Sequence, residues 1–264
     1  MTQLLYKWLK SDCGAPIGSG KWTKGRWRSV ECNLVPCQNG LHLARESDLV
    51  HYISERLWIA EADMSEVVEC ADKVVVRWAR VIERVETIDD GTLRAFAADC
   101  ADRVVHLTGP DPRYVNAIAV ARSFARQQAT AEELDAARPA AYAAAADAAA
   151  YAANAAARAA ASRDKAAAYA ANAAAYAANA AAWAAASRDK AAAYAANAAA
   201  WAAAYAADAA ADAADAADAD AYAAKKAAYA AANARLLQYV EHGSDAMDMP
   251  WPVTPAWPHM ERTL

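Results

Sequence analysis

The chain has 264 residues and a formal net charge of -5, which is too small in magnitude to indicate a dedicated nucleic-acid or membrane partner. Hydrophobic residues make up 58% of the sequence, but much of this share is alanine, whose methyl group buries little area. Because the composition changes abruptly near Pro139, we expect an α+β N-terminal domain followed by an all-α, alanine-rich helical region.

The cysteines and the apolar segments bear on where the protein works. The five cysteines, an odd number, fit reduced thiols better than a disulfide framework. The chain opens without the apolar run of a signal peptide, and its alanine-rich tract carries too many polar and charged residues to cross a bilayer. We therefore expect a cytoplasmic protein with no membrane partner.

Residues 1–90 are predicted to form a small α+β domain. Segments of alternating or β-branched residues predict strands at 4–9, 40–44, 57–62 and 73–85. Apolar residues at helical spacing predict a helix over 46–54, beginning near Ser47 or Asp48.

Basic residues and tryptophans are interleaved near the start of the chain. They are Lys7, Lys10, Lys21, Lys24, Arg26 and Arg28, with Trp8, Trp22 and Trp27. Tryptophans of this kind can stack on nucleic-acid bases. A solvated pair of strands with inward-facing aromatic residues accounts for the same pattern, and we favour it, so no nucleic-acid partner is expected.

Residues 91–138 are predicted to form capping helices that connect the two regions. The first, over 91–107, has an apolar face made of Leu93, Phe96, Ala97, Cys100, Val104 and Leu107. Asp99 and His106 share a face of this helix, but no nucleophile or paired base accompanies them in a known catalytic motif.

Two capping signals predict where the next helices begin. Asp111 is a favourable N-cap residue, and Pro112 follows it at the first helical position. Thr130 and Glu133 form a capping box for a short helix that is expected to end before Pro139.

A metal site can be drawn near the start of the chain. Cys32 and Cys37 precede His42 and His51, but their spacing differs from that of the common tetrahedral zinc motifs. Two buried thiols on adjacent strands explain the cysteines better. We expect no metal, no cofactor and no catalytic residue.

Residues 139–242 are an alanine-rich repeat without internal proline after Pro139 and without glycine. Two near-copies are displaced by 25 residues, each with a Ser-Arg-Asp-Lys segment, at 162–165 and 187–190. Aromatic and amide residues recur at intervals of seven, so they share one helical face. This face predicts a binding surface made of Tyr169, Asn172, Tyr176, Asn179, Trp183, Tyr194, Asn197 and Trp201.

Two architectures satisfy this repeat. A single rod of about 100 residues would be about 150 Å long. Alternatively, each Ser-Arg-Asp-Lys segment marks a reversal, and the alanine surfaces pack closely in a helical bundle. We favour the bundle, because a lone rod leaves its aromatic residues in water. The same surfaces could associate copies of the chain into a homo-oligomer.

Residues 243–264 form a tail rich in proline and tryptophan. The prolines at 250, 252, 255 and 258 are incompatible with a helix. From residue 244 onward we expect no helix. The tail is predicted to be either a disordered peptide or an extended strap that docks its tryptophans on the body.

Two resemblances add to this interpretation. Four segments resemble an alanine-rich immunity protein family of bacteria and phages. They are Ala97-Ala98-Asp99-Cys100-Ala101-Asp102-Arg103-Val104-Val105-His106-Leu107, the Asp111-Pro112-Arg113 turn with the helix over 119–125, the Ala/Tyr tract, and the closing Ala232-Asn233-Ala234-Arg235-Leu236-Leu237-Gln238-Tyr239. The stretches 37–44 and 72–76 are similar to a small domain at the start of phage proteins. Neither resemblance brings catalytic residues.

These resemblances imply a non-enzymatic protein that captures a partner protein or a small signalling ligand in phage or bacterial conflict. The capturing surface would be the aromatic face, or the groove between the helices and the α+β domain. A structural spacer or self-assembling virion-associated protein is an alternative.

A third alternative is a degenerate enzyme. Tyr6-Lys7-Trp8, followed at a distance by Gly40-Leu41-His42, is similar to the layout of ADP-ribosyltransferase-like domains. This resemblance places no catalytic glutamate, and Glu61 and Glu86 are the two candidates.

Overall fold

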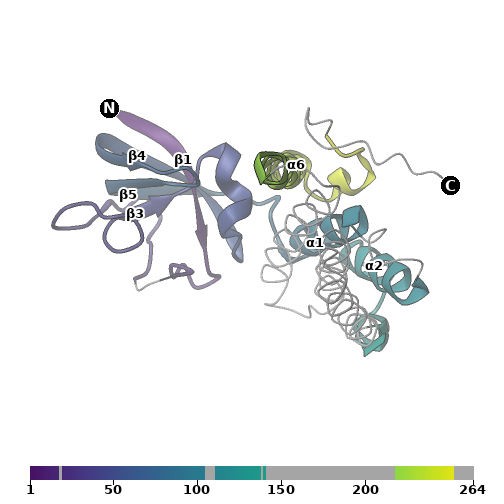
Figure 1. The fold of residues 1–264 in the computed structure, drawn as a ribbon. Helices are drawn as coiled ribbons and strands as arrows, with labels where there is room; N and C mark the ends of the chain where they lie inside the picture. Colours follow the sequence, from purple (N-terminus) through teal and green to yellow (C-terminus); the bar gives the residue numbers. More distant parts are fainter. Residues whose placement is uncertain (18–19, 105–110, 138, 141–217, 253–264) are drawn as a thin grey trace.

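The computed structural model describes residues 1–17, 20–104, 111–137, 139–140 and 218–252. A β-sheet unit lies on one side of the molecule, and the helices lie on the other (Figure 1). The fold class of the described residues is therefore mixed α+β, with an antiparallel sheet followed by helices, as predicted.

Five antiparallel strands form the sheet in the order β1-β4-β5-β2, and β3 also pairs with β5. Their bounds are Thr2–Leu9 (β1), Arg28–Ser29 (β2), Leu41–Leu43 (β3), Arg56–Glu69 (β4) and Val74–Arg84 (β5). The four predicted strands are confirmed. β4 is longer than predicted, because its last residues pair with the beginning of β5.

The sheet closes on itself between β1 and the end of β3. The Tyr6 N–H donates to the Ala44 carbonyl, and the Ala44 N–H donates to the Tyr6 carbonyl, both at 2.8 Å. Since β3 also pairs with β5, the path β1-β4-β5-β3 returns to β1. The interior holds small and branched apolar side chains, of which Leu9, Ala60, Ala62, Val76 and Ala79 are fully buried.

The outer face of this closed sheet packs against the helices. Trp8 of β1 is buried there, and its indole Nε1–H donates to the Leu49 carbonyl at 3.0 Å. The same hydrophobic core contains Phe96, Tyr114 and Tyr239 from the helical side. Because one core runs through both parts, burial of apolar area holds the sheet unit and the helices together.

A 3-10 helix, η1 (Glu46–Tyr52), follows β3 and confirms the predicted helical turn. It begins at Glu46, next to the start expected near Ser47 or Asp48, and Arg45 before it forms no side-chain capping hydrogen bond. Asp48 is turned inward, and its carboxylate accepts a hydrogen bond from Arg45 Nη1 at 2.6 Å, so it cannot cap the helix.

Two α-helices, α1 (Asp90–Val104) and α2 (Pro112–Ala125), cover the core next to the sheet unit. The Asp111 side chain accepts a hydrogen bond from the Arg113 N–H at 2.9 Å, which confirms the predicted N-cap. The capping box is confirmed as well, with Thr130 and Glu133 joined by hydrogen bonds of 2.7 and 3.2 Å.

The helix that follows this capping box spans residues 131–137. Residues 139–140 are helical, as expected for the start of the alanine-rich region.

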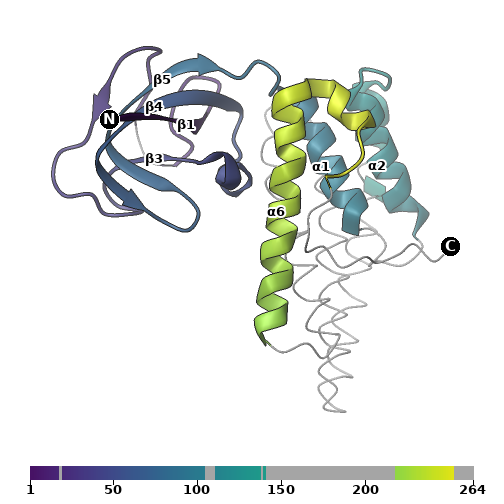
Figure 2. The ribbon, with the colours of Figure 1, turned by 90° about the horizontal axis from the view of Figure 1, so that it is seen from above.

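The last described helix, α6 (Asp218–His242), confirms helical structure at the end of the alanine-rich region. Figure 2 shows α6 between the sheet unit on one side and α1 on the other. The choice between a bundle and a rod for residues 139–242 depends on residues 141–217, which lie outside the described part of the chain. Within the described part, no helix has the length and apolar character needed to span a membrane.

The predicted absence of helix in the tail is wrong at its beginning. A 3-10 helix, η4 (Gly243–Asp248), follows α6 directly, and Gly243 has a left-handed φ of 58° at the junction. Proline begins to restrict the backbone only at Pro250, so η4 can form. Trp251 then packs against the core, and the Arg235 guanidinium lies 5.7 Å from its ring centroid, as in the strap alternative.

Candidate functional site

The predicted aromatic and amide face lies outside the described residues. This holds for all eight of its members: Tyr169, Asn172, Tyr176, Asn179, Trp183, Tyr194, Asn197 and Trp201. The described residues show instead how the end of the alanine-rich region is attached to the body, and they form a groove beside that attachment.

Asn233 attaches α6 to the sheet unit. Its side-chain Oδ1 accepts a hydrogen bond from the Val50 N–H at 3.0 Å, and its Nδ2 donates to the Glu46 carbonyl at 2.8 Å. Both partners are backbone groups of η1. The amide therefore satisfies two backbone groups of η1 while the alanines around it allow close approach.

A buried ionic cluster attaches α6 to the other helices; we call it the Asp99 cluster. Asp99 on α1 accepts hydrogen bonds from Arg235 Nε at 2.7 Å and from the Tyr239 hydroxyl at 2.8 Å, both on α6. Arg122 on α2 binds the other carboxylate oxygen at 2.7 Å. Asp99 and Arg235 are each 2% exposed, so this cluster is part of the core.

The electrostatics of the Asp99 cluster agree with a structural role. Burial, and then the charge of Asp99, raise the pKa of the Tyr239 hydroxyl, which therefore stays protonated and donates to the carboxylate. Burial also raises the pKa of the neighbouring Cys100 thiol well above its usual value. A protonated, buried thiol is a poor nucleophile.

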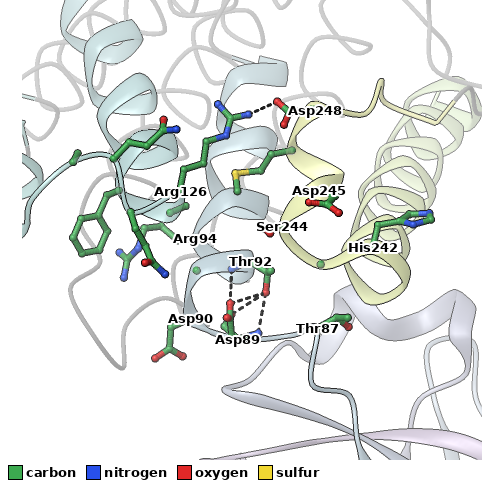
Figure 3. Close-up of a pocket in the computed structure, with 18 of the residues that line it drawn as sticks. Thr87, Asp89, Asp90, Thr92, Arg94, Arg126, His242, Ser244, Asp245 and Asp248 are labelled. Atoms are coloured by element: carbon green, nitrogen blue, oxygen red, sulfur yellow. Dashed lines mark hydrogen bonds and ion pairs between the residues drawn. The ribbon is translucent and has the colours of Figure 1, made fainter.

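An open groove of about 1120 Å³ lies where the sheet unit meets the helices, and we call it the junction groove. Figure 3 shows its walls: the connection after β5 and the start of α1, the end of α2, and η4 after α6. These segments are distant in the sequence, but each is fixed by the shared core or by the Asp99 cluster.

Local hydrogen bonds shape the floor of the junction groove. Asp89 caps α1 by accepting from the Thr92 N–H at 2.8 Å, and its own N–H donates to Thr92 Oγ1 at 2.9 Å (Figure 3). The Thr87 hydroxyl donates to the Val240 carbonyl at the end of α6, at 2.6 Å. The connection between sheet and helices is thereby tied to both helix ends.

Carboxylates outnumber guanidinium groups in the junction groove. The charged lining residues are Glu86, Asp89, Asp90, Asp245 and Asp248 against Arg94 and Arg126. Asp248 is paired with Arg126 at 2.5 Å (Figure 3), and Asp90 is paired with Arg56 at 2.8 Å. Asp245 is exposed on η4. Glu86 is paired with Arg84 at 3.3 Å, so the negative charge that the groove presents to solvent comes chiefly from Asp245.

The residues considered for a metal site are only partly brought together. His42 Nε2 accepts a hydrogen bond from the Cys37 N–H at 3.0 Å. His51 packs on Tyr229 instead, with ring centroids 4.9 Å apart. Burial, and then the charge of Lys7, lower the pKa of His42. Among the described residues, no group of three or more potential ligands could hold a metal ion.

The structure also places the cysteines and one of the two candidate glutamates. All five cysteines are free, but Cys32 and Cys37 are exposed rather than buried, so the expectation of two buried thiols is wrong. Both lie in a loop between β2 and β3 with left-handed φ values, outside the paired strands. Glu61, considered for an ADP-ribosyltransferase, is ion-paired with Arg80 at 2.6 Å.

Sequence reasoning missed the roles of Asn233 and Arg235. A signal was present, since both interrupt an alanine run just before Leu236, where a buried helix end begins. A polar residue in such a run is expected to have a specific partner when it is buried. His106, which shares a predicted face with Asp99, lies outside the described residues.

Comparisons with protein-family models, with curated proteins and with solved structures found no match for this chain.

Proposed function

We propose that this chain is a non-enzymatic binding protein of the immunity type, which captures a partner protein at the junction groove in phage or bacterial conflict. The setting rests on the sequence resemblance over residues 97–107, 111–113, 119–125 and 232–239 and in the Ala/Tyr tract. The binding role rests on the junction groove. The groove is open and acidic, and it lies next to the attachment of the alanine-rich region.

The size of the junction groove favours a polypeptide as its occupant. Its volume of about 1120 Å³ exceeds the range of about 300 to 1,000 Å³ that is typical of small-molecule pockets. It is open to solvent, so a partner can enter without a large rearrangement. The hydrogen bonds of Asp89 and Thr87 hold the floor in place before binding, which reduces the ordering cost.

The charge of the junction groove favours a basic segment of that partner. A carboxylate surplus attracts Lys and Arg side chains, and this attraction contributes mainly to association rate and specificity. Exposed charges are screened over about 8 Å at physiological ionic strength, so binding should weaken with salt. Asp89, Asp90 and Asp248 are engaged in a helix cap and in ion pairs, which leaves the exposed Asp245 to attract a basic partner.

The test uses fluorescein-labelled octalysine as a probe of the groove, with fluorescence anisotropy on the full-length protein. Asp245→Lys should weaken binding by about fivefold or more, because it reverses an exposed charge inside the groove. Glu31→Lys makes the same charge change on an exposed residue of the sheet unit and should change binding by less than about twofold.

Equal weakening by both substitutions would show that only net charge matters and would refute the groove as the binding site. Unchanged circular dichroism of both variants is the control for folding. A wild-type protein that fails to bind the probe even at low salt would also refute the proposal.

A further inference from the structure

A second, smaller cleft lies on the sheet unit, far in sequence from the junction groove. It has a volume of about 260 Å³, and we call it the basic cleft. Its lining residues are Lys21, Thr23, Arg26, Trp27, Arg28 and Ser29. The segment is fastened to β5 by the pairing of Arg28 with Ala79 and by a hydrogen bond of 2.8 Å from the Gly25 N–H to the Val81 carbonyl.

Arg28 is held in one orientation inside the basic cleft. Its Nη1 donates to the Lys21 carbonyl at 2.6 Å, and its guanidinium lies 5.0 Å from the Trp22 ring centroid. Gly20, with φ of 110°, leaves the space that the guanidinium occupies, because a Cβ there would lie 2.5 Å from Nη2. A guanidinium fixed in this way can bind an anion with little loss of side-chain entropy.

The cations around Arg28 lack matching carboxylates. No ion pair joins Lys7, Arg26 or Arg28 to an acidic residue in the part of the chain that the structure describes. Lys21 is paired with Asp12 at 3.2 Å, and both side chains are more than half exposed. Such an exposed pair contributes little, so the positive charge of the cleft remains available to a ligand.

Lys7 adds to this charge from inside the closed sheet. It lies between Leu5 and Leu9 on the inner face of β1, and its Nζ donates to the His42 carbonyl at 2.6 Å and lies 5.6 Å from the Trp22 ring centroid. Burial, and then the charge of Arg28, lower the pKa of Lys7 to about 8. A bound anion would relieve this repulsion between like charges.

Trp27 provides an aromatic surface at the same cleft. The Arg80 guanidinium lies 5.0 Å from its ring centroid, and Arg80 is in turn anchored to Glu61 at 2.6 Å. Trp27 nevertheless remains 38% exposed. An exposed indole beside fixed cations is the combination that binds a base by stacking and a phosphate by charge.

We propose that the basic cleft binds a nucleoside phosphate, with the phosphate on Arg26 and Arg28 and the base stacked on Trp27. The cleft suits a single nucleotide unit, which can be a free nucleotide or one unit of a single-stranded nucleic acid. This site is separate from the junction groove, so its failure and the failure of the proposed function are distinguishable.

Isothermal titration calorimetry on the full-length protein tests the ligand chemistry with four probes: AMP, adenosine, inorganic phosphate and single-stranded octa-adenylate. AMP should bind at least about fivefold more tightly than adenosine or phosphate, because only AMP uses both the aromatic surface and the cations. If octa-adenylate binds about tenfold more tightly than AMP, the natural ligand is a single-stranded nucleic acid. If octa-adenylate and AMP bind with equal affinity, the natural ligand is a free nucleotide.

Variants of exposed residues test the location. Arg26→Glu and Trp27→Ala should each weaken AMP binding by at least about fivefold, and Trp27→Phe should retain most of the affinity, because it keeps an aromatic ring. Lys226→Glu, the same charge change on an exposed residue of α6, is the matched control and should have little effect.

Two results would overturn the proposal. The first is that AMP binds no more tightly than inorganic phosphate. The second is that Arg26→Glu and Trp27→Ala leave the affinity for AMP unchanged, or that Lys226→Glu lowers it as much as they do.

Discussion

Asp99 holds together three helices through one carboxylate. Its two oxygens accept hydrogen bonds from Arg122, Arg235 and Tyr239, and Arg235 is as deeply buried as Asp99 itself. A buried ion pair contributes little compared with an apolar replacement, but loss of one partner leaves an uncompensated charge. Because both arginines have Asp99 as a counter-charge, the stability of the folded protein depends on this carboxylate.

Asp99→Asn should lower the free energy of unfolding by about 3 to 5 kcal/mol, because the amide leaves the buried Arg235 without a counter-charge. Urea denaturation followed by circular dichroism measures this change. Asp102→Asn is the matched control on the same helix. Asp102 also binds Arg122, at 3.2 Å, but it is 37% exposed. Its loss should cost about 1 kcal/mol or less, and equal losses in the two variants would contradict the structural role given to Asp99.

At the scale of elements, α6 is the piece that joins the sheet unit to the helices. Asn233 faces η1, while Arg235 and Tyr239 reach α1. A helix made largely of alanine offers little apolar area, so its docking depends on these few polar side chains and on Leu236. The alanines contribute by letting the neighbouring backbones approach.

Asn233→Ala should weaken the attachment of η1 to α6 and have less effect on the rest of the fold. The Val50 N–H would lose its acceptor, and its hydrogen exchange should become about tenfold faster or more, as expected for the loss of a buried hydrogen bond. Amide exchange measured by NMR reports this directly. Gln238→Ala removes an amide from the same helix, but that amide binds the Pro250 carbonyl at 3.1 Å and Arg235 Nη1 at 2.7 Å, and it makes no hydrogen bond to η1. It should leave Val50 unchanged, and acceleration in both variants would show a general loosening of α6 instead.

For the whole molecule, the shared core makes the sheet unit and the helices one body, and the overall dimensions then depend on the alanine-rich region. If that region folds back as the favoured bundle, small-angle scattering of the 264-residue chain should give a radius of gyration of about 18 Å. A rod of about 150 Å would by itself give about 43 Å. A value close to the rod would refute the bundle. Measurements at several concentrations would also show whether the chain self-associates.

Features that depend on neighbours in the sequence were predictable. The alternation in β1 and the β-branched residues of β5 predicted strands, and the capping residues Asp111 and Thr130 placed two helix starts correctly. Each of these signals acts within one or two turns of chain, so the residues that make it are also the residues that form the structure.

The sequence by itself determined the strands β1, β3, β4 and β5, the helices η1, α1 and α2, the free cysteines and the alanine-rich character of α6. Only the tertiary structure decided that Tyr6 closes the sheet against Ala44, that Arg235 reaches Asp99, and that both clefts form. The physical reason is separation along the chain. Asp99 and Arg235 lie 136 positions apart, and no local propensity records such a pairing. It arises when burial of the shared core brings two charged groups together and each offsets part of the desolvation penalty of the other.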